Sequence, residues 1–420
     1  MLKLLLLPIG LLLSAFLFFN DDSPLDNKES SAETNKIYRQ QISQGLGLDI
    51  KNNLLPAEKE FQFNALKNKF SINYTLDQNL QKESDSLLKK YKPDYGAIVM
   101  IDAKTGRILA MSSFQKSDTH ASNLNLRATF PAASVFKVIT ASAAIDHSGL
   151  SPDHKIAFNG GNYTLYKRNV LSETVNRWTR FISLKDAFAK SINTAFGRLA
   201  IENIEPQILN AYAEKFMFNT DIQTDFPVEK SIAQIPENKG FELSQVASGY
   251  NRFNTMSPVH GAMIAASIIN EGRMNHPYIV DELVDSNKKI IYKAAQFQNQ
   301  QIISVESAAK VQSMMEQTVL AGTSRKTFRK MLHEKKFSEI EMGGKTGHFS
   351  GTNPKGRTDW FIGYATDGNN KVAIAAITVN IQKWTVKSSA LGEMMFRKHF
   401  KSVLEDKEIT KIASIRKNRS

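Results

Sequence analysis

The pattern of apolar and polar positions divides the chain into segments of different character. Residues 4–19 form an almost uninterrupted apolar run behind Lys3. Residues 20–36 are polar, acidic and without periodicity, which predicts a flexible linker. Residues 37–70 mix Gln and Lys with scattered apolar positions, and we interpret them as a short helical lead-in. Apolar residues then recur among charged ones over residues 76–91, which predicts an amphipathic helix.

Further along, runs of apolar residues predict strands at both ends of a helical region. Residues 97–101 and 107–113 are expected to pair as a hairpin whose turn contains Gly106. The chain then has a mostly helical pattern to about residue 275, with helices expected at 130–145, 184–189, 194–201, 206–216 and 260–270. Strands are expected at 278–284, 342–348, 360–364 and 372–379. This order predicts an α+β fold, in which helices flank an antiparallel sheet and an all-helical lobe is inserted.

The apolar run near the N-terminus is typical of a signal sequence or a retained anchor. A helix of this length reaches about 24 Å, somewhat less than the hydrocarbon core of about 30 Å. The run ends in Phe18 and Phe19 followed by Asn20, without the small residues that a signal peptidase prefers. We therefore favour a single-pass anchor in the cell (inner) membrane, with the rest of the chain in the periplasm or on the outer face of the membrane.

Composition narrows the range of partners. The chain has 420 residues, of which 42% are hydrophobic and 23% charged, as in an ordinary globular protein. Its net charge of +13 favours anionic surroundings such as lipid headgroups or an acidic cell-wall polymer. The basic residues form no compact motif, so we expect no nucleic-acid partner. The chain lacks cysteine and a His-x-x-x-His spacing, so neither a metal site nor a cofactor is expected.

Ser134 and Lys137 are the first candidates for chemistry, because they lie in the apolar segment 130–145, where Pro131 suits the start of a helix. A spacing of three places both side chains on one helical face, one turn apart. Burial lowers the pKa of a lysine, so that Lys137 could accept the proton of the Ser134 hydroxyl. Taken alone, a Ser-x-x-Lys spacing is weak evidence.

Two further motifs follow in a specific order. Ser191-Ile192-Asn193 lies in AKSINTAFGRLA, and Lys345-Thr346-Gly347 lies in EMGGKTGHFSG. The order Ser-x-x-Lys, Ser-x-Asn, Lys-Thr-Gly resembles the penicillin-binding transpeptidase family. The segments TLDQNLQ and GAIVMIDAKTGRILAMSS resemble the start of that family's domain, and MSPVHGAMIAASIINEGRM, AGTSRKT and DWFIGYA resemble later blocks of it. Together they extend the resemblance over roughly residues 70–400.

The resemblance implies a serine D,D-transpeptidase that cross-links peptidoglycan and reacts with D-Ala-D-Ala stem peptides and with β-lactam antibiotics. It implies that Ser134 is the nucleophile and Lys137 its base, that Ser191 relays the proton and that Asn193 bonds both the substrate and the lysine. It further implies that Lys345 supplies positive potential, that Thr346 binds the substrate carboxylate, that Gly347 keeps the strand accessible and that the N–H groups of Ser134 and His348 form an oxyanion hole.

These features give an expected division of the chain. We expect an anchor or signal sequence at 1–19, a linker and lead-in at 20–60, a transpeptidase domain at 61–405 and a basic C-terminal tail at 406–420. The tail is expected to be a solvated helix, with contact to a membrane as the alternative. Cell-wall synthesis proteins are further candidate partners.

Two positions leave the reaction type open. His348 follows Lys-Thr-Gly, where many large family members have Thr or Ser, and histidine there resembles D,D-carboxypeptidases. Glu205 superficially resembles a deacylating glutamate, but Pro206 is better explained as the first residue of a helix. A carboxypeptidase or β-lactamase, and a penicillin-binding sensor or scaffold, therefore remain alternatives to the transpeptidase.

Overall fold

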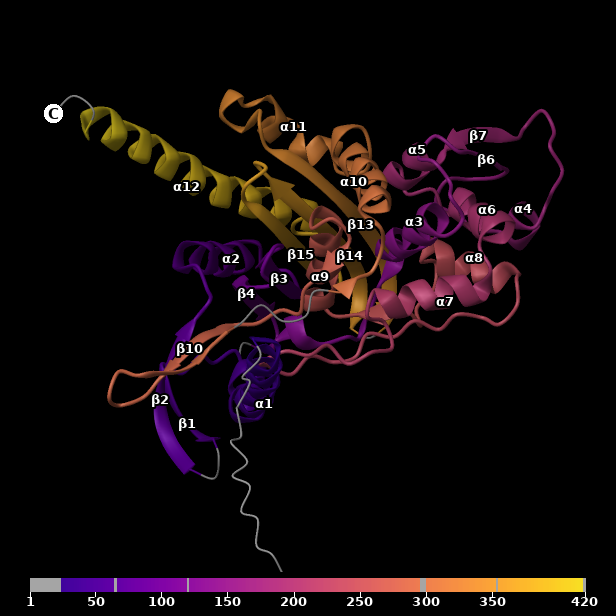
Figure 1. The fold of residues 1–420 in the computed structure, drawn as a ribbon. Coiled ribbons are helices and arrows are strands. Elements are labelled where there is room, and N and C mark those ends of the chain that lie inside the picture. The colour runs from indigo at the N-terminus through magenta and orange to yellow at the C-terminus, as the bar shows by residue number, and fades with distance from the viewer. Residues whose placement is uncertain (1–23, 64–65, 119–120, 295–299, 353, 418–420) are drawn as a thin grey trace, which may run out of the picture.

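A five-stranded antiparallel sheet lies at the centre of the protein, in the strand order β13-β14-β15-β3-β4 (Figure 1). Its strands are β3 (Tyr95–Asp102), β4 (Ile108–Gln115), β13 (Glu341–Thr352), β14 (Lys355–Thr366) and β15 (Lys371–Asn380). The computed structural model describes residues 24–63, 66–118, 121–294, 300–352 and 354–417. The predicted hairpin is confirmed, with Gly106 at φ +83° in its turn. Strand β13 forms one edge of the sheet, so that its outer side is available to a ligand.

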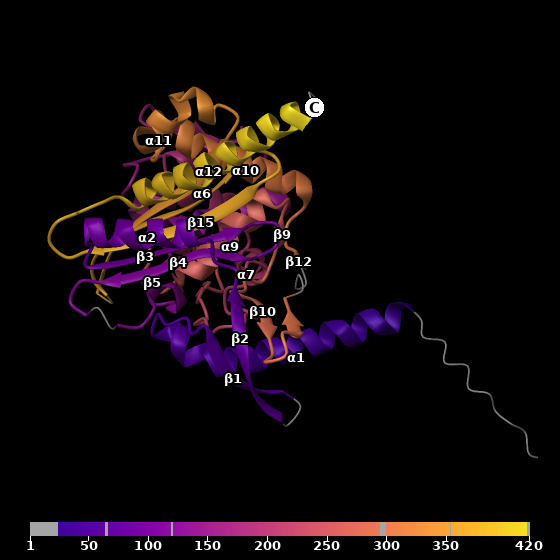
Figure 2. The ribbon, with the colours of Figure 1, turned by 90° about the vertical axis from the view of Figure 1, so that its left-hand side faces the viewer.

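Helices cover both faces of this sheet, as predicted (Figure 2). One face packs against α2 (Gln78–Tyr91), α11 (Arg325–His333) and α12 (Ser388–Lys417). The other face packs against α9 (Pro258–Ile269) and α10 (Val305–Leu320). Asp77 caps α2 by accepting hydrogen bonds from the N–H groups of Asn79 and Leu80. The sequence predicted that the transpeptidase domain ends at residue 405 and a C-terminal tail follows, and helix α12 continues through this position without a break.

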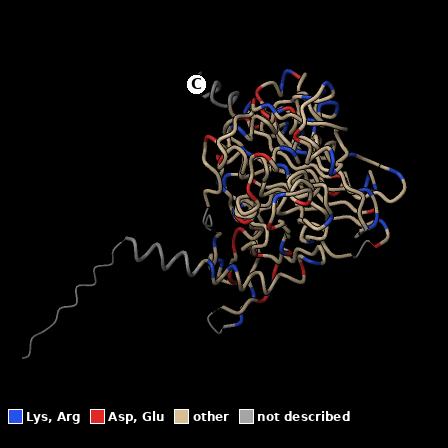
Figure 3. Tube along the Cα trace, turned by 90° about the vertical axis from the view of Figure 1, so that its right-hand side faces the viewer, with Lys and Arg blue, Asp and Glu red and all other residues tan. Residues whose placement is uncertain are grey.

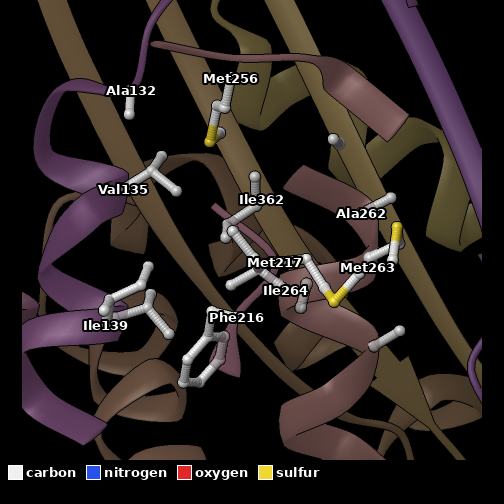
Figure 4. Packing of buried hydrophobic residues seen from close by; sticks show 14 of the residues in the cluster. Ala132, Val135, Ile139, Phe216, Met217, Met256, Ala262, Met263, Ile264 and Ile362 are labelled. Carbon is white, nitrogen blue, oxygen red and sulfur yellow. The ribbon is translucent and has the colours of Figure 1, made fainter. Parts of the chain in front are cut away.

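The inserted lobe lies beside the β13 side of the sheet. Its helices are α3 (Lys137–Asp146), α4 (Lys167–Val170), α5 (Leu184–Ala189), α6 (Asn193–Asn203), α7 (Pro206–Lys215) and α8 (Phe241–Ser248). The lobe also contains a hairpin of β6 (Lys155–Phe158) and β7 (Arg180–Ser183), which the prediction of helices alone did not include. Buried apolar side chains, including Val135, Ile139, Met263 and Ile362, join α3 to α9 and the sheet (Figure 4).

The N-terminal part differs from its predicted structure. Residues 24–36, expected to be an irregular linker, belong to α1 (Pro24–Lys51). The region 37–70, expected to be a short helical lead-in, instead contains β1 (Glu58–Phe63) and the greater part of β2 (Leu66–Tyr74) after the end of α1. These strands join β10 (Val280–Val284) and β11 (Ile290–Lys293) in a second, four-stranded antiparallel sheet. Helix α1 packs on this sheet because its residues Ile42, Leu46 and Ile50 are buried against Phe61 and Phe63.

Short strand pairs and 3-10 turns complete the described structure. The pairs are β5 (Phe130–Pro131) with β8 (Thr255–Met256), and β9 (Arg273–Met274) with β12 (Gln300–Gln301). The 3-10 turns are η1 (Leu124–Leu126), η2 (Ala133–Phe136) and η3 (Lys335–Phe337). No helix within the described ranges is both long and apolar enough to cross a membrane, and the apolar run 4–19 lies outside those ranges.

Candidate active site

Ser134 lies in a tight turn between the lobe and the edge of the sheet. The predicted continuous helix over 130–145 is wrong at its start, because β5 and η2 precede α3, which begins at Lys137. Ala133 has φ +50°, a left-handed conformation that is unfavourable for a residue with a Cβ atom and incompatible with a regular α-helix. Ser134 is therefore presented by a 3-10 turn and not by the first turn of the long helix.

Hydrogen bonds from two other elements fix this turn. The indole N–H of Trp360, on β14, donates to the carbonyl of Pro131 at 2.9 Å. The N–H of Ala132 donates to the carbonyl of Asn254 at 2.8 Å. The turn is thus tied to the sheet on one side and to the segment after α8 on the other.

Lys137 is fully buried and connects the turn to the lobe. Its Nζ lies 2.8 Å from Ser134 Oγ, 2.8 Å from Asn193 Oδ1 and 2.5 Å from the carbonyl oxygen of Ser248. The amide of Asn193 is held in place because its Nδ2 donates to the carbonyl of Tyr163 at 2.9 Å. The motif residues Ser134, Lys137 and Asn193 therefore meet, as the sequence predicted.

The surroundings of Lys137 favour its neutral form. Burial, and then the positive charge of Lys345, hold its pKa well below the usual range of a lysine. A neutral amine has two N–H groups and one lone pair. Asn193 Oδ1 and the Ser248 carbonyl can only accept hydrogen bonds, so they take both N–H groups. The lone pair is then left for the hydroxyl of Ser134, which is the geometry a general base requires.

A second lysine and serine lie beside this group. Lys345 Nζ is 2.9 Å from Ser191 Oγ and donates to the carbonyl of Thr346 at 2.9 Å. Burial lowers the pKa of Lys345 to about 7. Ser191 follows α5 with φ +56°, which keeps it outside both α5 and α6. The Ser-x-Asn and Lys-Thr-Gly motifs therefore also come together, with Ser191 as the contact between them.

The next two residues of β13 show why a strand edge suits this site. Thr346 Oγ1 is 2.7 Å from Thr323 Oγ1, which adds a second hydroxyl to the one predicted. Gly347 lies against the Ser134 turn, where an added Cβ would be 3.3 Å from the backbone nitrogen of Ser134. A Cβ atom at this position would be in tight contact with the backbone of the turn, which gives Gly347 a packing role as well.

His348 is held away from the serine. Gly347 and its cross-strand partner Trp360 face the lobe, so His348 and its partner Asp359 face the opposite side of the sheet. The ring nitrogen Nε2 of His348 lies 2.8 Å from the buried carboxylate of Asp359, and the ring contacts Trp384 edge to face. Asp359 also accepts a hydrogen bond from the N–H of Ser388 at 2.7 Å, at the start of α12.

Glu205 is engaged elsewhere. It precedes Pro206 at the start of α7, as predicted, and its carboxylate lies 2.6 Å from Nζ of Lys239.

Within the described ranges, no group of three or more His, Asp or Glu side chains is placed to hold a metal ion.

Sequence reasoning missed Ser248, Thr323 and Asp359 as parts of this site. Thr323 and Asp359 lie in blocks that supported the family resemblance, but nothing in the sequence shows their contacts with Thr346 and His348. Ser248 contributes only a backbone carbonyl, for which a sequence contains no signal.

Comparison with known proteins identifies the family. Residues 96–400 match the model of the penicillin binding protein transpeptidase domain, so the chain belongs to this family and the predicted resemblance is confirmed. It is 24% identical over 318 residues to Stage V sporulation protein D of Bacillus subtilis, covering 71% of this chain and 47% of that protein. It is 26% identical over 348 residues to the peptidoglycan D,D-transpeptidase PbpA of Mycobacterium tuberculosis, covering 74% of this chain and 67% of PbpA. The chain therefore spans about half the length of the sporulation protein and two thirds of that of PbpA.

Solved structures share the fold. The imipenem acyl-enzyme complex of penicillin-binding protein A from M. tuberculosis has a TM-score of 0.64 at 22% identity, with 79% of each chain covered. The aztreonam complex of penicillin binding protein 3 from the same organism has a TM-score of 0.66 at 19% identity, covering 81% of this chain and 80% of that one. These similarities confirm the predicted α+β fold with its inserted lobe.

Proposed function

We propose that the protein is a serine D,D-transpeptidase that forms an acyl-enzyme at Ser134 with stem peptides ending in D-Ala-D-Ala and cross-links peptidoglycan. The observation that carries this proposal is the position of Lys137 Nζ, buried and 2.8 Å from Ser134 Oγ while two carbonyl acceptors bind its N–H groups. Membership of the transpeptidase family and the name of the mycobacterial relative support the same activity.

In the proposed acylation, Ser134 Oγ bonds to the carbonyl carbon of the penultimate D-alanine and its proton passes to Lys137. The C–N bond to the terminal D-alanine then breaks, and the leaving nitrogen receives a proton through Ser191. The N–H groups of Ser134 and His348 stabilise the oxyanion. A β-lactam would open its ring at Ser134 in the same way and retain its leaving group.

Binding of the terminal carboxylate of the substrate is assigned to the Lys-Thr-Gly motif on β13 and its neighbour Thr323. Lys345 supplies a buried amine, and Thr346 and Thr323 present hydroxyl groups 2.7 Å apart at the edge of β13. Asn193 is assigned to the substrate backbone as well as to Lys137. These groups bind the substrate without a metal or cofactor.

Transfer to an amine is favoured over hydrolysis by the position of His348. Its imidazole pairs with Asp359 on the face of the sheet opposite Ser134, so it is not available to activate water on the acyl group. Glu205, the other candidate base, pairs with Lys239. Carboxypeptidase or β-lactamase activity is therefore the second candidate, and a penicillin-binding sensor or scaffold the third.

The proposed setting is the outer face of a cell membrane. The apolar run at residues 4–19 supports a single-pass anchor, and the net charge of +13 suits a lipid surface and an acidic wall polymer. Lys and Arg are spread over several parts of the molecule (Figure 3). Association with other cell-wall synthesis proteins belongs to the same proposal.

Two substitutions test the proposal. Ser134→Ala should abolish covalent labelling by a fluorescent penicillin, because it removes the nucleophile and only one small hydroxyl. Lys137→Ala should reduce the labelling rate by at least about a hundredfold, because it removes the base. Circular dichroism and thermal unfolding would show that both variants are folded. Undiminished labelling of folded Ser134→Ala would contradict the assignment.

A further inference from the structure

Four exposed aromatic residues lie in the inserted lobe, outside the groups proposed to catalyse acylation. Tyr163 is 65% exposed, Tyr166 57%, Trp178 72% and Phe181 63%, and these four residues form the aromatic cluster. All belong to residues 159–181, which run from the end of β6 through α4 to the start of β7. In Figure 1 the part between α4 and β7 forms the outer edge of the lobe. Large aromatic side chains exposed together indicate a binding surface.

Hydrogen bonds bring the two ends of this segment together. Arg180 Nη1 donates to Asn162 Oδ1 at 2.8 Å, and the hydroxyl of Thr179 donates to Asn159 Oδ1 at 2.9 Å. The last two aromatic residues lie within two positions of Arg180 in the chain, and Tyr163 follows Asn162. The aromatic cluster therefore occupies one small part of the lobe.

The same segment is bonded to the Ser-x-Asn motif. The N–H of Asn193 donates to the carbonyl of Asn162 at 2.8 Å, and its Nδ2 donates to the carbonyl of Tyr163 at 2.9 Å. The hydroxyl of Thr194, the next residue, donates to the carbonyl of Gly161 at 2.9 Å. The aromatic cluster therefore begins at the edge of the candidate active site and is fixed in position relative to Asn193.

Positive charge accompanies the aromatic side chains. Residues 159–181 contain one acidic residue and four basic ones, which are Lys167, Arg168, Arg177 and Arg180. All four basic residues are exposed. The guanidinium of Arg177 lies 4.7 Å from the centre of the Trp178 ring, where it orients the indole. The segment therefore attracts anions and at the same time presents flat apolar rings.

This combination suits a carbohydrate polymer with acidic groups. The C–H groups of a sugar ring carry small positive charges and pack against the negative face of an aromatic ring. Carboxylates on the polymer pair with the basic residues. A lipid surface suits similar residue types, but the apolar run at residues 4–19 precedes α1, and the outer edge of the lobe lies away from α1 (Figure 1). The position of the aromatic cluster therefore favours the polymer.

We propose that the aromatic cluster binds the glycan strand of peptidoglycan, by stacking sugar rings on the aromatic side chains and by pairing carboxylates of the strand with the basic residues. A bound strand would lie beside Asn193, so that stem peptides attached to it are held near Ser134. This proposal rests on the proposed transpeptidase function, because it adds a second point of contact with the same polymer.

Glycan strands without peptides test the proposal. An amidase that cleaves the bond between the lactyl group and the first amino acid leaves the sugars and their carboxylates, and removes the part that would react with Ser134. The full chain, in nanodiscs of zwitterionic lipid, is titrated with these strands in a calorimeter. We expect saturable binding that weakens as salt is added and that is unchanged after Ser134 has been acylated by penicillin.

Paired variants separate stacking from general apolar contact. Trp178→Leu with Phe181→Leu keeps apolar side chains but removes two flat rings, so it should raise the Kd for glycan at least about tenfold. Trp178→Phe with Phe181→Tyr keeps a ring at each position and should hold the Kd within about twofold. Leu48→Ala with Leu54→Ala changes two other exposed apolar residues, in and just after α1, and should leave the Kd unchanged. Penicillin labelling should be the same in all three.

Absence of saturable binding by the unaltered protein would overturn the proposal, as would an unchanged Kd in the double leucine variant. Binding to vesicles of anionic phospholipid in place of glycan, lost in the same variant, would overturn it and identify a lipid surface. Penicillin labelling at Ser134 in these samples tests the proposed function separately. Its loss in the unaltered protein would contradict that function, whereas labelling without glycan binding would contradict only the role of the aromatic cluster.

Discussion

At the scale of single residues, the chemistry depends on two neighbouring buried lysines, Lys137 and Lys345. Burial is the main cause of the low pKa of Lys137, and Lys345 lowers this pKa further because two positive charges in one buried site repel each other. Lys137 is a base only when it is neutral, so acylation should slow as the pH falls through its pKa. The charge of Lys345 keeps that pKa low and so extends the active range towards acidic pH.

This coupling predicts a shift in the pH profile. In Lys345→Met, the pKa of Lys137 should rise because a neighbouring cation is gone, and the acidic limb of penicillin acylation should move to higher pH. The second-order labelling rate measured at a series of pH values gives the position of that limb. Lys190→Met, which removes an exposed lysine next to Ser191, should leave it in place. An unmoved limb in Lys345→Met would contradict the coupling.

The residues of the three motifs were predictable because their types and spacing are visible in the sequence. The contacts that orient these residues were not predictable from the sequence. Asp359 faces His348 only because β13 and β14 pair in one particular register, and Ser248 acts through a backbone carbonyl. Such contacts depend on packing between segments far apart in the chain.

At the scale of elements, the turn that presents Ser134 depends on the close approach of α8. Gly249 ends that helix with φ +65°, and the carbonyl of Ala133 occupies the space where a Cβ would lie. The strained φ of Ala133 is thus maintained by its neighbours, as is common where backbone geometry serves a site.

A pair of glycine substitutions separates this contact from backbone strain. Gly149 has φ +68°, and none of the described residues has a heavy atom within 4 Å of the position that a Cβ would take there. Alanine at either site costs about 1–2 kcal/mol for the left-handed conformation. Gly249→Ala should also displace the Ser134 turn and lose most penicillin labelling, whereas Gly149→Ala should lower the melting temperature and keep labelling. Similar labelling of the two variants would show that the contact is not needed.

Elements were predicted best where one pattern dominates. The buried strands of the central sheet and helices such as α5 and α7 follow from apolar runs and caps. Strands β1 and β2 were missed because Glu, Lys and Gln, which favour helices, alternate with their apolar residues. Apolar residues at every second position, Phe61 and Phe63 in β1 and Phe70 and Ile72 in β2, were the signal for these strands. Exposed ion pairs such as Glu60 with Lys67 lie on the other face of the sheet.

At the scale of the whole molecule, the N-terminal helix α1 and the C-terminal end of α12 lie on opposite sides of the protein (Figure 1). Helix α1 packs on the second sheet through Ile42, Leu46 and Ile50 and is part of the folded body. An anchor at residues 4–19 would therefore hold that side of the molecule near the membrane. The candidate active site would be separated from the membrane by the second sheet and α1.

Fractionation tests this arrangement. The full chain should remain with the membrane after a high-salt wash, because an apolar helix is not displaced by salt. A chain beginning at Pro24 keeps all of α1 and should be recovered in the soluble fraction with unchanged penicillin labelling. Recovery of the exported full chain with a new N-terminus near Asn20 would show cleavage in place of anchoring.

The fate of the acyl-enzyme tests the central claim most directly. The protein is mixed with a penicillin, the adduct on the Ser134 peptide is followed by mass spectrometry, and turnover of a chromogenic cephalosporin is measured alongside. We predict an adduct at Ser134 that persists for many minutes and feeble hydrolysis, because His348 is bound to Asp359 and does not activate water. His348→Thr should leave that lifetime unchanged. Rapid cephalosporin turnover that His348→Thr abolishes would contradict the account and identify the protein as a hydrolase.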